Sequence, residues 1–128
     1  MKLDEVAVSL LATVTGIDAK SIATTMLYSV PTGKSMIVSK CVIRCTAFSV
    51  GSKSVQAVAS FGGNSTTYDD YLNSVTYTIS AINKAICDWV TDSEIPVYAS
   101  GTSFRLSIET GSNATTETWA VDLFGYLV

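Results

Sequence analysis

Lys34 is the first residue whose surroundings suggest chemistry, because Thr-Gly-Lys-Ser at 32–35 looks like the end of a phosphate-binding loop. Such a loop needs an earlier glycine and a helix after the lysine, so that backbone N–H groups surround the phosphates. Tyr28 occupies the place of that glycine, and residues 35–43 are rich in β-branched side chains, which favour a strand. Pro31 suits the second position of a β-turn. The stretch therefore predicts a turn before a strand and no nucleotide site.

Carboxylates are the remaining source of acid–base chemistry, because the sequence contains no histidine. Without histidine, the Ser-His-Asp and Cys-His arrangements and nearly all catalytic zinc sites are excluded. Two acidic groups stand out, residues 69–70 and the set Asp88, Asp92 and Glu94. They could supply the carboxyl pair of a glycoside hydrolase, but neither has the spacing of a calcium loop. We expect solvated loop carboxylates, with no catalytic residue, no metal and no cofactor. A carboxylate-based glycan-active enzyme ranks third, behind the two structural roles given below.

The three cysteines predict reduced thiols. Cys41 and Cys45 lie four residues apart on an expected strand, which separates them by roughly 13 Å. A disulfide needs Cα atoms within about 7 Å, so this pair cannot form one, and Cys87 could pair with only one of them. Asp4 and Glu5 stand where a signal peptide would carry positive charge. We therefore expect mature chain from the first residue, made in a reducing cytoplasm.

Length and charge limit the classes of partner. The chain has 128 residues, which suits a single domain over 1–128, and its net charge is −3 with 8 scattered basic residues. Nucleic-acid binding requires a basic patch and membrane-surface binding a basic amphipathic helix, and neither pattern is present. We expect no nucleic acid and no membrane as partner. Hydrophobic residues make up 48% of the chain, and this apolar excess favours an oligomer.

Alternating apolar and polar residues predict β-structure along most of the chain. In 103–109, for example, the apolar Phe104, Leu106 and Ile108 alternate with polar residues. Alternation or short apolar runs predict strands at 22–30, 37–46, 55–61, 75–81, 86–91, 95–99, 103–109 and 118–123, separated by turn signals. The segment 6–14 is ambiguous between strand and helix. Together these segments predict an all-β protein, an antiparallel β-sandwich or jelly roll of about eight strands.

Four segments carry a resemblance to a known class of protein. They are TTMLYSVPTGKS at 24–35, IVSKCVIRCT at 37–46, residues 61–71 and VDLFGYL at 121–127. Together they resemble small structural proteins of tailed bacteriophages. The resemblance implies a jelly-roll-like virion protein, often trimeric, that decorates the capsid or is placed on the tail. It supplies no functional residue that transfers to this chain.

Two virion roles follow as expectations. A receptor-binding module would need an attachment segment, and the sequence shows neither coiled-coil heptads nor a glycine-rich shaft. We therefore expect a capsid decoration (cement) protein that binds the major capsid protein on the outer capsid surface as a homotrimer. A tail or fibre receptor-binding module is the alternative. The candidate subunit or capsid contacts are the apolar N-terminal residues and two loop aromatics, Val6, Val8, Leu10, Leu11, Tyr71 and Trp89.

Overall fold

The computed structural model describes residues 8–128, and every regular element in this part of the chain is a β-strand. The all-β prediction is confirmed, with eight strands. In chain order they are β1 (Ser9–Asp18), β2 (Thr24–Ser29), β3 (Met36–Ser49), β4 (Ala57–Gly62), β5 (Leu72–Tyr77), β6 (Ala85–Asp88), β7 (Ser103–Thr110) and β8 (Thr116–Leu127).

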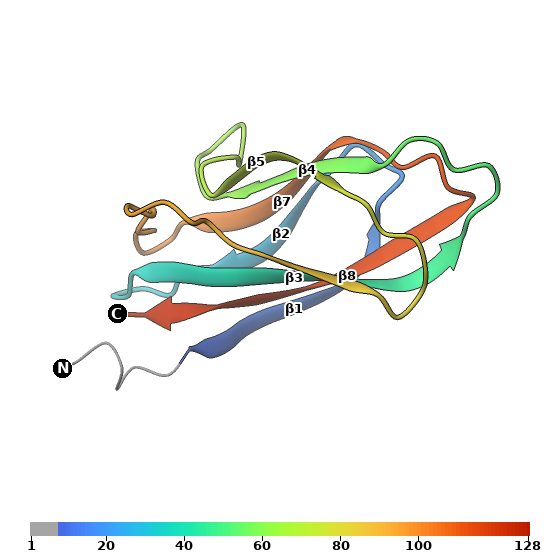
Figure 1. The fold of residues 1–128 in the computed structure, drawn as a ribbon. Coiled ribbons are helices and arrows are strands. Elements are labelled where there is room, and N and C mark those ends of the chain that lie inside the picture. Colours follow the sequence, from blue (N-terminus) through green and yellow to red (C-terminus); the bar gives the residue numbers. More distant parts are fainter. Residues whose placement is uncertain (1–7) are drawn as a thin grey trace.

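The strands form two antiparallel sheets of four that pack face to face as a β-sandwich (Figure 1). One sheet has the order β1-β8-β3-β6, and the other has the order β2-β7-β4-β5. Among the described strands, only β4 and β5 follow each other within one sheet; every other connection crosses from one sheet to the other. Sequence neighbours therefore rarely pair, and the sheets are built from long-range contacts.

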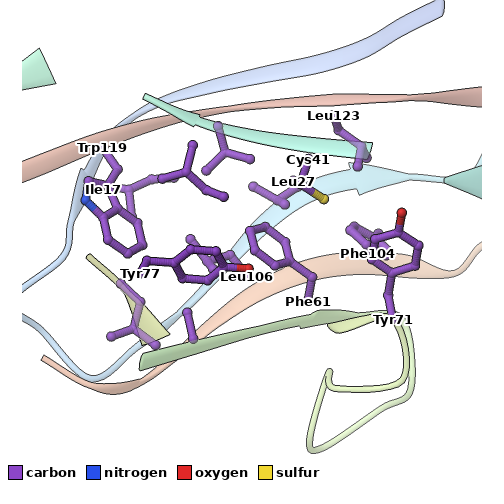
Figure 2. Packing of buried hydrophobic residues seen from close by; sticks show 14 of the residues in the cluster. Ile17, Leu27, Cys41, Phe61, Tyr71, Tyr77, Phe104, Leu106, Trp119 and Leu123 are labelled. Atoms are coloured by element: carbon purple, nitrogen blue, oxygen red, sulfur yellow. The ribbon is translucent and has the colours of Figure 1, made fainter. Parts of the chain in front are cut away.

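Aromatic side chains fill the space between the sheets (Figure 2). The ring of Tyr77 on β5 meets Phe61 on β4 and Trp119 on β8 edge-to-face, at centroid distances of 6.2 and 6.0 Å. Phe104 on β7 makes the same kind of contact with Tyr71, at 5.9 Å. Such pairs add to the free energy gained by burying large apolar surfaces. Because Tyr77 and Trp119 belong to different sheets, their contact holds the two layers together.

The structure differs from the sequence-based predictions in several segments. Residues 9–14 of the ambiguous segment 6–14 belong to a strand, β1, the strand expected at 75–81 ends at Tyr77, and the expected strand at 95–99 does not form. Only Tyr98 of that run makes a β-bridge, to Met36. Pro96 has no N–H to donate to a ladder, and β6 already occupies the middle of the free edge of β3. The apolar run thus serves as a loop anchored by Tyr98.

The turn predicted before the third strand is confirmed. The backbone N–H of Lys34 donates to the carbonyl of Pro31 at 3.1 Å, and Gly33 has φ of +79°. Such positive φ values favour glycine. The chain then enters β3 rather than a helix, so the phosphate-binding geometry is not formed.

A buried ion pair lies at the end of the sandwich near Trp119. The ammonium of Lys53 lies 2.7 Å from the carboxylate of Glu117, and their side chains are only 4% and 0% exposed. Glu117 also accepts hydrogen bonds from Ser112 and from the Trp119 indole, while Lys53 donates to the carbonyl of Ile79. These bonds join the β3–β4 and β5–β6 connections to the start of β8.

Candidate functional site

The outer face of the β1-β8-β3-β6 sheet carries a group of apolar side chains, termed the apolar face. Along β3, Cys41 and Ile43 point into the core, so Val42 between them points outward. The same alternation along β8 turns Phe124 outward next to the buried Leu123. The apolar members of this face are Leu10, Ile37, Val42, Cys87, Phe124 and Tyr126.

Strand register places these side chains in rows across the sheet. Leu10 on β1 is opposite Phe124 on β8, and Phe124 is opposite Lys40 on β3. In the next row, Val42 on β3 is opposite Cys87 on the edge strand β6. Directly opposed residues on one face are close enough for their side chains to touch. The apolar face is thus one surface contributed by all four strands.

The charged groups on this face are mostly partnered within the chain. Arg44 donates two hydrogen bonds to Asp122, at 2.7 and 3.1 Å, and Thr13 donates a third at 2.9 Å. The hydrogen bonds from Arg44 hold the pKa of the Asp122 carboxyl below its ordinary value. The ammonium of Lys40 lies 5.0 Å from the centre of the Phe124 ring, a cation–π contact. A partner that covered this face would therefore meet apolar surface, the paired charges of Arg44 and Asp122, and the ammonium of Lys40.

The structure separates the predicted contact residues into three groups. Val8, Leu10 and Trp89 are 43%, 55% and 51% exposed, and their side chains are available to a partner. Leu11 packs against the core, and Tyr71 is only 6% exposed because it lies against Phe104 (Figure 2). Val6 falls outside the described residues.

Leu11 and Tyr71 thus contribute mainly to the fold. Burial also raises the pKa of the Tyr71 hydroxyl well above its ordinary value. Of the apolar-face residues that the sequence analysis did not select, Val42 lies within the predicted strand 37–46. Phe124 lies one residue beyond the predicted strand 118–123, in the part of β8 that the prediction missed. Alternation identifies outward residues such as Val42, but it does not tell which outward residues gather on one sheet.

The acidic residues of the 62–71 loop have structural roles. Asp69 accepts hydrogen bonds from the side chains of Asn64 and Thr67, which lower the pKa of its carboxyl. Asp70 accepts bonds from the Gly63 backbone and from the hydroxyl of Tyr98. These contacts tie the loop to its base and leave the two carboxylates engaged with neutral donors.

The second acidic group is dispersed. Asp88 accepts hydrogen bonds from the Tyr77 hydroxyl, at 3.0 Å, and from the Trp89 backbone N–H. Asp92 and Glu94 are exposed. Within residues 8–128, no three His, Cys, Asp or Glu side chains come together in a way that could hold a metal ion.

The cysteines occupy two environments. Cys41 and Cys45 lie buried on β3, as their spacing predicts, and Cys87 is exposed on β6; all three are free thiols. Burial raises the pKa of Cys41 well above its ordinary value, with smaller contributions from Asp88 and Cys87. Cys41 is thus a poor nucleophile, and Cys87 is the accessible thiol of the described chain.

Two hollows open on the surface. One, of about 380 Å³, lies beside the start of β6 and is lined by Arg44, Cys45, Thr46, Asn83, Lys84 and Ala85. The other, of about 260 Å³, is lined by Gly63, Ser65, Tyr68, Gly101, Thr102 and Ser103. The guanidinium of Arg105 lies 5.4 Å from the centre of the Tyr68 ring. The sequence does not indicate this second hollow, because its lining residues come from two loops that are far apart in the chain.

No protein-family model matches the chain, and neither the curated proteins nor the solved structures yield a match. Across residues 8–128, no helix has the length and apolar character needed to cross a membrane. The functional argument therefore depends on the fold and on the surfaces described above.

Proposed function

We propose that this protein is a virion structural protein of a tailed phage, which binds the outer capsid surface as a homotrimer. In this role it contacts the major capsid protein and carries out no catalytic step. The virion context and the trimeric state come from the resemblance of the segments at 24–35, 37–46, 61–71 and 121–127 to small phage structural proteins.

The strand order supports the jelly-roll part of this proposal. In a jelly roll, the chain winds back and forth between two sheets, so that strands distant in sequence become neighbours. The orders β1-β8-β3-β6 and β2-β7-β4-β5 pair the first strand with the last and the second with the seventh. This pairing is what a single antiparallel ribbon wrapped into two sheets would give.

The observation that carries the association proposal is the contrast between the two outer faces. The β1-β8-β3-β6 sheet presents the apolar face, with Leu10 55% exposed. The outer face of the other sheet is more polar: β7 presents Arg105, Ser107 and Glu109 there, and Met26 on β2 is its exposed apolar side chain. Apolar patches rimmed by polar residues favour protein contacts, and closed symmetric oligomers bury such patches against each other. We infer that subunits associate through the apolar face.

Two matched variants test this association. Leu10→Ser removes an exposed apolar side chain from the apolar face, and Met26→Ser removes one, 42% exposed, from the outer face of the other sheet. Fully burying an exposed leucine contributes about 1.5–3 kcal/mol, and Leu10 has about half of its surface left to bury. Leu10→Ser should therefore weaken self-association roughly tenfold, whereas Met26→Ser should not. Equal effects of the two substitutions on sedimentation would show that the apolar face is not the interface.

The capsid role has its own test. Purified protein mixed with emptied capsids of the parent phage should sediment with them and raise the temperature at which they open, because binding stabilises the closed shell. Cryo-microscopy of the virion should then show it on the capsid surface. Density for the protein at the tail alone would refute decoration and leave the tail or fibre receptor-binding role as the better proposal.

A further inference from the structure

The smaller hollow lies on the other sheet, away from the apolar face. It is formed where the loop after β4 meets the loop that leads into β7. Its volume of about 260 Å³ falls just below the range of about 300–1,000 Å³ typical of drug-sized ligands, which suits a ligand of one small ring. The lining residues Ser65, Thr102 and Ser103 supply hydroxyls, and Tyr68 supplies an aromatic side chain with a hydroxyl of its own.

Arg105 does not itself line this hollow, but it packs on Tyr68, which does. It follows Ser103 by two residues on β7, so both side chains rise from the same face of the sheet. Its guanidinium packs over the Tyr68 ring at 5.4 Å. Its Nε atom is buried and has no hydrogen-bond acceptor within residues 8–128, where the two ion pairs involve Arg44 and Lys53 instead.

A buried guanidinium nitrogen without an acceptor is costly, and arginine is suited to bind a carboxylate through two parallel hydrogen bonds. The terminal nitrogens of the Arg105 guanidinium are not buried, unlike Nε, and no carboxylate within residues 8–128 pairs with them, so they are the atoms that an external carboxylate can reach. The neighbouring hydroxyls can donate hydrogen bonds to a polyhydroxy ligand and accept them from it.

The walls of the hollow are held in place before any ligand arrives. The side-chain oxygen of Asn64 accepts hydrogen bonds from the backbone N–H groups of Asp69 and Asp70. Asp70 fixes the other side by accepting hydrogen bonds from the Gly63 backbone and the Tyr98 hydroxyl. A preformed site loses less conformational entropy on binding than one that must order itself.

We propose that this hollow binds an acidic sugar, a single pyranose ring that bears a carboxylate. Arg105 binds the carboxylate, and the hydroxyls of Ser65, Thr102 and Ser103 hydrogen-bond to the ring hydroxyls. Tyr68 contributes its hydroxyl and orients Arg105. The site is formed by β7 and the loops at its end, so its binding does not depend on assembly through the apolar face or on capsid attachment.

The test uses two probes that differ only in the carboxylate, methyl β-glucuronide and methyl β-glucoside. Each is titrated into ¹⁵N-labelled protein while the amide resonances of Gly63, Gly101 and Thr102 are followed. We expect glucuronide to shift these amides with roughly millimolar affinity, as befits so small a ligand. The glucoside should bind about tenfold more weakly, because it lacks the charge-assisted bonds to Arg105.

Two variants at matched charge complete the test. Arg105→Gln should reduce glucuronide binding to the level of the glucoside, and Lys34→Gln, on the exposed β2–β3 turn, should leave binding unchanged. Unperturbed resonances outside the hollow would show that the Arg105 variant is folded. The proposal is overturned if the three amides do not shift, if both sugars bind equally, if Arg105→Gln binds as wild type does, or if acetate alone reproduces the glucuronide shifts.

Discussion

Lys53→Met is expected to be one of the most destabilising substitutions in the chain. The methionine keeps most of the apolar stem but leaves the Glu117 carboxylate, which is 1% exposed, without its cation. Removing one partner of a buried ion pair costs about 3–5 kcal/mol, because the remaining charge is buried without compensation. Domains of this size have a free energy of unfolding of about 5–15 kcal/mol. The substitution should thus remove a large part of the total.

The assay is urea unfolding followed by far-UV circular dichroism, at one fixed protein concentration because assembly would add to the apparent stability. With an m-value of about 2 kcal/mol/M, a loss of this size lowers the urea midpoint by roughly 2 M; in a thermal scan it corresponds to a fall in Tm of about 10–20 °C. Arg44→Gln serves as the control, because it breaks an ion pair of the same 2.7 Å length whose arginine is 41% exposed. Exposed pairs contribute about 0–1 kcal/mol.

The double variant Lys53→Met/Glu117→Gln sharpens the reasoning. It removes the unpaired charge, while the amide oxygen introduced at position 117 can still accept a hydrogen bond from Ser112 or Trp119. It should therefore be more stable than Lys53→Met alone, and the two substitutions should be non-additive. If Lys53→Met costs no more than Arg44→Gln, the buried pair does not hold this end of the sandwich and the argument fails.

Two further predictions concern titration and thiol access. Because Arg44 lowers the pKa of Asp122, the folded state binds that proton less readily than the unfolded state does. The resulting stability is complete above the ordinary carboxyl pKa of about 4 and is lost as pH falls through the lowered value. Unfolding measured in urea below about pH 4 should accordingly depend less on pH in Arg44→Gln than in wild type; equal slopes would contradict this cause. In the folded Leu10→Ser variant, which we expect to be mainly single chains, iodoacetamide should modify Cys87 rapidly and leave Cys41 and Cys45 intact until unfolding, and mass spectrometry showing all three modified at one rate would contradict the buried placement.

The fold could be predicted from sequence where alternation is regular. Residues 103–109 and 118–123 alternate cleanly and lie within β7 and β8. The N-terminal segment was ambiguous because Leu10 faces outward while Leu11 packs on the core, and a register irregularity separates Leu10 from Ala12. Two adjacent leucines across such an irregularity break the two-residue period.

The functional surfaces were harder to predict, because they depend on which strands become neighbours. The pairing of β8 with both β1 and β3 creates the apolar face from three distant segments. Likewise, Arg105 reaches Tyr68 only because β7 pairs with β4, where Gly62 is opposite Arg105. The burial of Tyr71 also depends on this arrangement, since Phe104 covers it from β7. Local periodicity carries no information about such pairings.

The central claim, self-association through the apolar face, is tested most directly by sedimentation equilibrium of the purified protein at micromolar concentrations. Wild type should give a mass of about 41 kDa, three times the 13.6 kDa of one chain, and Leu10→Ser should shift the population toward the single chain. A wild-type mass that stays at one chain over the whole concentration range would contradict the claim.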